Sequence, residues 1–104
     1  MKRIYLSGPM TGFPDLNFPA FNTMAANLRS AGHQVINPAE IDHVSDEWAD
    51  CLRLDIIHLM ECGSIALLPG WESSKGAKLE VHIARELGMT VVNAHDLVSM
   101  EIAG

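Results

Sequence analysis

The chain has 104 residues, of which 48% are hydrophobic, so it can build one modest core and we predict a single domain over residues 1–104. Its formal net charge of −6 excludes the broad basic surface that a nucleic-acid polymer requires, although local groups can still bind one small anion. No apolar run approaches the roughly 18 residues of a membrane span, and no signal-peptide pattern is present, so we expect no membrane partner and a cytoplasmic location.

Short apolar segments alternate with helical patterns along the chain. The segments predict strands over 2–7, 34–37, 64–68 and 89–93. Apolar residues at helical spacing predict a helix around 21–28 that ends at Gly32, a second over about 47–61 with Asp46 as its N-cap, a third over about 74–87, and a short terminal helix. This order predicts an α/β fold: a three-layer flavodoxin-like domain with a short parallel sheet, strand order 2-1-3-4, flanked by helices.

Ligands of such sheets bind beyond the carboxyl ends of the strands. In this sequence those ends are polar and fall at 7–12, 37–40, 69–74 and 93–96. Surface loops are commonly polar, so polarity alone does not define a site. The candidate binding residues that we take from these ends and from the start of the third helix are Gly8, Pro9, Met10, Asn37, Trp71, Ser73, Ser74, Lys75 and Gly76.

Three of these assignments have an alternative. Asn37, together with Glu40, could read the edge of a base, although Glu40 could equally cap a turn. Trp71 could stack on a base or belong to an interface. The run 73–76 (SSKG) offers a hydroxyl, a cation and free backbone N–H groups that suit a phosphate, but an ordinary serine N-cap gives the same pattern.

Glu80 lies on the apolar face of the predicted third helix. At 100° per residue its neighbours on that face are Gly76, Ala77, Ile83, Ala84 and Leu87. Lys75, Lys78, His82 and Arg85 lie on the opposite face. An unpaired carboxylate facing the sheet would be costly, so Glu80 is either a bonded structural acid or a functional one.

Asp55 repeats this pattern on the second helix. It shares a face with Trp48, Cys51, Leu52, Leu59 and Cys62. Either acid alone is more simply structural. Two buried acids on helices that flank one strand, with separated pKa values, suit the cleavage of a glycosidic bond.

Three parts of the chain together resemble one enzyme family. They are the run 5–10 (YLSGPM), Asp55 on its helix, and the run 74–80 (SKGAKLE) that ends in Glu80. In order and spacing they resemble the nucleoside 2-deoxyribosyltransferase superfamily, most closely its short phage and bacterial domains, over residues 4–92. The resemblance implies that Glu80 is the nucleophile, that Asp55 either helps to protonate the leaving base or shapes the site, and that Tyr5 orients Glu80. It implies a nucleoside or nucleotide substrate and no cofactor.

Two positions depart from the usual pattern of that family. Ser74 stands where the transferases tend to carry an acid, and serine is typical of the branch that hydrolyses 2′-deoxynucleoside 5′-monophosphates. Gly63 stands where related sequences often have aspartate. Because a neighbouring subunit often completes the pocket in this superfamily, we expect a homodimer or a higher homo-oligomer.

Two other functions remain open. Pro69 and Gly70, with Gly76 and Glu80, distantly resemble the cytokinin-type phosphoribohydrolases, but the second glycine and the threonine of their motif are missing. The domain could also be a non-catalytic module that binds a nucleotide or a nucleotide sugar, because a fold does not fix a function.

The sequence contains no pattern typical of a metal site or of a disulfide. The five histidines (His33, His43, His58, His82 and His95) and the two cysteines lack metal-ligand spacing, so we predict no metal site. If Cys51 and Cys62 share one helix, about 16 Å of helical rise separates them, which excludes a disulfide between them.

Overall fold

A computed structural model describes the backbone of residues 3–103 and the side chains of residues 3–98. It contains four strands, four α-helices and three short 3₁₀ turns within that range. In chain order these are β1 (Ile4–Ser7), η1 (Pro14–Asn17), α1 (Phe18–Ser30), β2 (Val35–Ile36), η2 (Pro38–Glu40), α2 (Trp48–Leu59), β3 (Ser64–Leu67), η3 (Trp71–Ser73), α3 (Lys75–Glu86), β4 (Thr90–Asn93) and α4 (Ala94–Ala103). The predicted alternation of strands and helices is confirmed.

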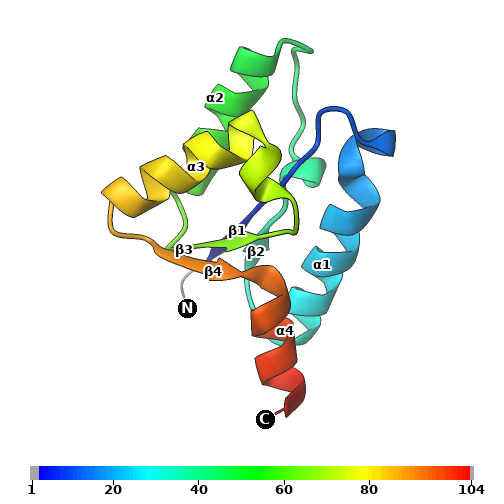
Figure 1. Cartoon of the computed structure of the whole chain (residues 1–104), viewed down its shortest axis with the longest axis vertical. Helices are drawn as coiled ribbons and strands as arrows, with labels where there is room; N and C mark the ends of the chain where they lie inside the picture. The colour runs from blue at the N-terminus through cyan, green and yellow to red at the C-terminus, as the bar shows by residue number, and fades with distance from the viewer. Residues whose placement is uncertain (1–2, 104) are drawn as a thin grey trace.

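The four strands form one sheet of order β2-β1-β3-β4 in which every neighbouring pair is parallel. The two central strands pair over their full length, from Ile4 opposite Ser64 to Ser7 opposite Leu67. Both strands therefore end at the same edge of the sheet. The predicted strand order 2-1-3-4 is confirmed, and Figure 1 shows α1 and α4 on one side of the sheet and α2 and α3 on the other.

Side-chain alternation along β1 divides the core into two layers. Ile4 and Leu6 point to the layer beneath α1 and α4, where Phe21 and Leu28 are fully buried. Tyr5 points to the other layer, together with residues of α2 and α3. Since Ser7 follows Tyr5 by two positions, it shares the face of β1 that meets α3. This face of β1 later supplies the two hydroxyl groups of the candidate site.

Several predicted boundaries need correction. Strand β1 begins at Ile4, and Lys2 lies outside the described residues. The prediction that Asp46 caps α2 is wrong: Glu47 is the N-cap and no side chain caps it, while Ser45 Oγ accepts a hydrogen bond from the Glu47 N–H. Helix α2 ends at Leu59, so Cys62 lies beyond it; both thiols are free. No helix in the described part of the chain is long and apolar enough to cross a membrane.

Gly8 follows β1, where the chain passes close to the end of β3. A Cβ atom built on Gly8 would lie 2.8 Å from Leu68 Cβ, which is too close for two carbon atoms. We expect Gly8→Ala to lower the free energy of unfolding by about 1–3 kcal/mol, because backbone must shift to admit the methyl group. Urea unfolding measures this change.

Gly76→Ala is the matched control for that experiment. A Cβ atom on Gly76 would meet Leu52 Cδ1 and Trp48 Nε1 at 3.7 Å, which is ordinary contact. Alanine also favours a helix more than glycine does, so the control should be as stable as the wild type or more stable. Equal destabilisation of the two variants would contradict the packing role of Gly8.

Candidate active site

A cleft of about 840 Å³ lies at the carboxyl edge of the sheet. Its walls come from the end of β1 with the loop that follows it, from η1, from the loop before α2, and from the first turns of α2 and α3. The cleft brings together ten of the residues that the sequence nominated: Tyr5, Gly8, Pro9, Met10, Asp55, Ser73, Ser74, Lys75, Gly76 and Glu80. The position agrees with the general location of ligand sites in parallel α/β sheets.

Glu80 borders this cleft and is only 5% exposed. Both of its carboxylate oxygens accept a hydrogen bond from β1. The Tyr5 hydroxyl donates to Oε2 at 2.6 Å, and Ser7 Oγ donates to Oε1 at 2.8 Å. Tyr5 and Ser7 are themselves buried, so the carboxylate is held in one orientation by rigid strand residues.

Burial raises the pKa of Glu80 from an ordinary 4.5 to about 7. The hydrogen bonds from Tyr5 and Ser7 lower this pKa because they stabilise the carboxylate, while the charge of Asp55 raises it further. Burial, followed by the charge of Glu80, raises the pKa of Tyr5 well above its usual value. Tyr5 is therefore a neutral hydrogen-bond donor, and Glu80 exchanges its proton near neutral pH.

Asp55 projects from α2 into the same cleft and forms a pair with a histidine. His43 Nε2 lies 2.7 Å from Asp55 Oδ1, and both side chains are largely buried. Burial raises the pKa of Asp55, although the hydrogen bond and the charge of His43 act in the opposite direction. Asp55 therefore holds a proton more readily than an exposed aspartate does.

The start of α3 forms another wall of the cleft. Ser74 is the N-cap residue, and its Oγ accepts a hydrogen bond from the Ala77 N–H at 3.2 Å. The next residue, Lys75, places its ammonium group 4.4 Å from the ring centroid of Trp48. Among the described residues Lys75 is the one lysine or arginine that lines the cleft. With the N–H groups of the first helical turn, it makes this end of the cleft the most suitable for an anion.

Residues 2–93 match the family described as a domain of unknown function (DUF4406). The chain belongs to this family. No curated protein matches the chain.

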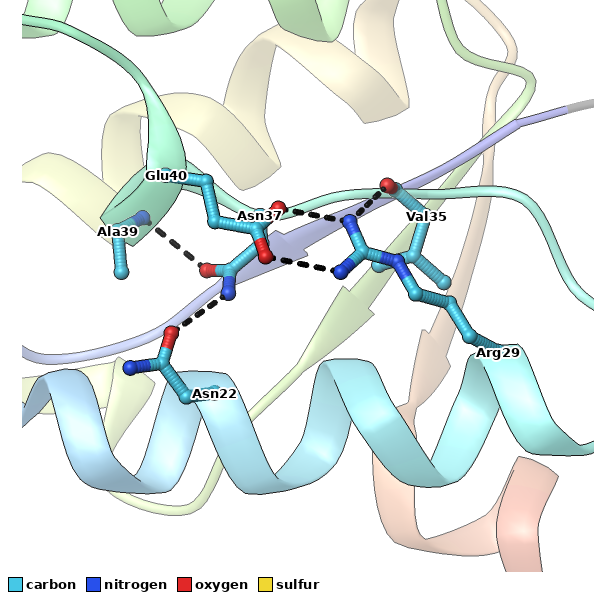
Figure 2. A network of polar contacts seen from close by, with 6 residues as sticks. All are labelled: Asn22, Arg29, Val35, Asn37, Ala39 and Glu40. Carbon is cyan, nitrogen blue, oxygen red and sulfur yellow. Dashed lines mark hydrogen bonds and ion pairs between the residues drawn. The ribbon is translucent and has the colours of Figure 1, made fainter.

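The assignment of Asn37 to the ligand site stays a prediction. Asn37 does not line the cleft of the DUF4406 domain and is 2% exposed. Its Oδ1 accepts from the Ala39 N–H, and its Nδ2 donates to Asn22 Oδ1, both at 3.0 Å (Figure 2). These bonds fix the turn after β2 against α1. The side-chain amide of Asn37 therefore has a structural role in holding this turn.

Glu40 belongs to the same structural network. Arg29 donates to both of its carboxylate oxygens, at 2.9 and 2.7 Å, and also to the carbonyl oxygen of Val35 (Figure 2). Arg29, Asn37 and Glu40 border a different cavity, of about 480 Å³. This network ties α1 to the edge strand and takes no part in the site.

The assignment of Trp71 to the site also stays a prediction. Trp71 is not among the residues that line the cleft, and it packs against the core layer beneath α2 and α3. The tryptophan of the cleft is Trp48, at the start of α2. The sequence had placed Trp48 on the face of Asp55, which was the available signal that it would approach the site.

Two further polar residues of the site were missed from the sequence. Ser7 could have been found, because it shares with Tyr5 the strand face that meets Glu80. His43 lies in an irregular loop between η2 and α2, and no periodic pattern places its ring beside Asp55. Within the described part of the chain, no cluster of three or more His, Cys, Asp or Glu residues could hold a metal ion.

Proposed function

We propose that this DUF4406 domain cleaves the N-glycosidic bond of a ribo- or deoxyribonucleoside 5′-monophosphate through a covalent intermediate on Glu80. The observation that carries the proposal is the buried Glu80 carboxylate, held by two hydroxyl groups beside an open cleft that also contains Asp55. Retaining glycosidases use such a pair of carboxyl groups, one as nucleophile and one as acid. The resemblance to the nucleoside 2-deoxyribosyltransferase superfamily supports the same assignment.

In the first step, a carboxylate oxygen of Glu80 attacks C1′ of the sugar. The bond between C1′ and the base nitrogen breaks, and its electron pair leaves with the base. Asp55 in its protonated form donates a proton to the base, which departs neutral. The resulting Asp55 carboxylate retains its hydrogen bond with His43. Tyr5 and Ser7 keep the nucleophile oriented.

In the second step, water attacks C1′ of the glycosyl ester. Asp55 accepts a proton from this water, and the ester C–O bond breaks with its electron pair returning to Glu80. The products are the free base and the sugar 5-phosphate, and both carboxyl groups regain their starting states. If a second base replaces the water, the same site performs a transfer reaction instead of hydrolysis.

The start of α3 is proposed to bind the 5′-phosphate. Ser73, Ser74 and Lys75 line this end of the cleft, and the Ser74 hydroxyl can still donate its proton because its oxygen accepts from Ala77. We expect Ser74→Ala to raise KM for a nucleoside 5′-monophosphate by roughly tenfold, as for the loss of one hydrogen bond to a charged group. KM for the corresponding nucleoside should not change.

Parallel kinetics on the nucleoside and on its 5′-monophosphate provide the measurement. Ser74→Ala also removes the N-cap of α3 and so lowers the stability of the protein, which thermal unfolding measures. A loss of folded protein lowers the activity toward both substrates equally. An equal loss of activity toward both substrates would refute the phosphate site.

The proposed function is tested first by chromatography. Purified protein is incubated with each common ribo- and deoxyribonucleoside 5′-monophosphate, and free base is measured. Release by the wild type identifies the reaction and its substrate. If no base is released from any of them by folded protein, the glycosidase proposal fails, and thermal shifts caused by nucleotides then test the alternative of a non-catalytic binding module. A cytoplasmic location and a homodimer or higher homo-oligomer belong to the same proposal and rest on the sequence.

A further inference from the structure

The loop between β1 and α1 contains an unusual stretch of backbone. Asp15, Leu16 and Asn17 have φ angles of 51°, 52° and 62°, and they are the non-glycine residues of positive φ in the described chain. For an L-residue this left-handed region brings Cβ against the backbone, and only Asn and Asp tolerate it well. Leu16 therefore occupies a conformation that its own side chain disfavours.

Hydrogen bonds hold the stretch in place. Asn17 Nδ2 donates to the carbonyl oxygen of Pro9 at 2.9 Å, and the Leu16 N–H donates to that of Phe13 at 3.0 Å. Pro14 further restricts the turn. A strained conformation persists when its surroundings determine it, and such strain is concentrated at sites of function.

Side chains of the strained turn are exposed on the wall of the cleft. Leu16 is 50% exposed and Phe13 is 46% exposed, and both line the cleft together with Phe18. The turn thus presents large apolar side chains to solvent on the wall of the site, where neither strain nor exposure is favourable for the free protein. We call Phe13, Leu16 and Phe18 the apolar clamp.

We propose that the apolar clamp binds the base of the substrate, an inference that rests on the function proposed above. The sugar carbon C1′ must lie at Glu80, and the phosphate fits the start of α3, where Lys75 lies. The clamp carries no charged side chain, so it suits neither the phosphate nor the hydroxyl groups of the sugar. A nucleobase has flat faces that pack well on aromatic and aliphatic side chains.

Three variants separate the strain from the contact. Leu16→Gly removes the side chain and accepts positive φ, so it should raise Tm by a few degrees and raise KM about tenfold. Leu16→Ala removes the same contact but keeps the strained backbone, so it should raise KM similarly without raising Tm. Asp15→Gly is the matched control, because Asp15 does not line the cleft and aspartate already tolerates positive φ: Tm should change little and KM should stay at the wild-type value.

The readouts are KM for the monophosphate that the wild type cleaves and Tm from thermal unfolding. An unchanged KM in both Leu16 variants would overturn the clamp while leaving the glycosidase intact. If the two Leu16 variants instead self-associate more weakly than the wild type while KM is unchanged, the base-binding role is also overturned, because the clamp would then contact a second copy of the chain.

A wild type that releases no base removes the proposed function but still tests the clamp. In that case the probe is the rise in Tm caused by each nucleoside 5′-monophosphate. A rise in Tm that is lost in Leu16→Ala and kept in Asp15→Gly supports the clamp. An equal rise in the wild type, Leu16→Ala and Asp15→Gly overturns it, as does the absence of any rise in the wild type.

Discussion

Glu80→Gln is expected to abolish base release by this domain without unfolding it. Glutamine has the size of glutamate, and its amide can still exchange hydrogen bonds with Tyr5 and Ser7, so the packing around α3 is preserved. An amide does not form the glycosyl ester, and the loss of a covalent nucleophile lowers kcat by at least about 10³-fold. Initial rates of base release, measured with matched amounts of folded protein, test this expectation.

Glu86→Gln is a suitable control for this substitution. Glu86 is the last residue of the same helix and is exposed, so its replacement makes the same chemical change on that helix without touching the cleft. Wild-type rates are expected for the control. If Glu80→Gln instead retained wild-type activity, Glu80 would not be the nucleophile, and any glycosidase activity would need a different mechanism.

The fold could be predicted because its signals are local. Each strand is a short apolar run ended by glycine, proline or a polar residue, and each helix repeats its apolar positions every three or four residues. Alternation of the two elements leaves few arrangements of a parallel sheet. The strand order followed from these constraints. The cap of α2 did not, because the helix begins one residue later than Asp46 allows: Glu47 is the N-cap, and Ser45 binds the Glu47 N–H.

The directions of site side chains on helices and strands could be predicted from the sequence, whereas those of side chains in loops could not. Glu80, Asp55 and Tyr5 sit on helices and a strand, where periodicity gives the direction of each side chain. All three border the cleft as expected. Asn37 and Trp71 lie at the ends of strands, where the following turn decides whether a side chain faces the ligand or the protein. Neither lines the cleft. Trp48, which does, shares the Asp55 face of α2 and could have been found, whereas the place of His43 depends on the path of its loop.

The stability of this domain is expected to fall as pH rises from about 4.5 to about 7. In the unfolded chain Glu80 loses its proton near its ordinary pKa of 4.5, whereas burial raises the pKa to about 7 in the folded protein. Between these values the folded state binds more protons than the unfolded state, so each rise in pH favours unfolding. The contribution of Glu80 is fully present below pH 4.5 and is lost above pH 7. The two pKa values correspond to about 3 kcal/mol.

Glu80→Gln isolates this contribution, because the glutamine does not titrate. Urea unfolding of both proteins across pH 4 to 8 gives the difference in their free energies of unfolding at each pH. The wild type and the variant have the same other titrating groups, so the contributions of these groups to the free energy of unfolding largely cancel in this difference. We expect the variant to gain about 3 kcal/mol on the wild type between the two ends of the range.

Two parallel stability curves would show that Glu80 titrates normally in the folded protein and that its burial does not alter its proton affinity. The expected divergence would instead mean that the domain loses stability at neutral pH by holding an ionisable carboxylate against its core. Because two hydroxyl groups from β1 already satisfy that carboxylate, hydrogen bonding alone does not remove the penalty. A residue that destabilises its own fold at working pH is typical of an active site, where stability and activity oppose each other.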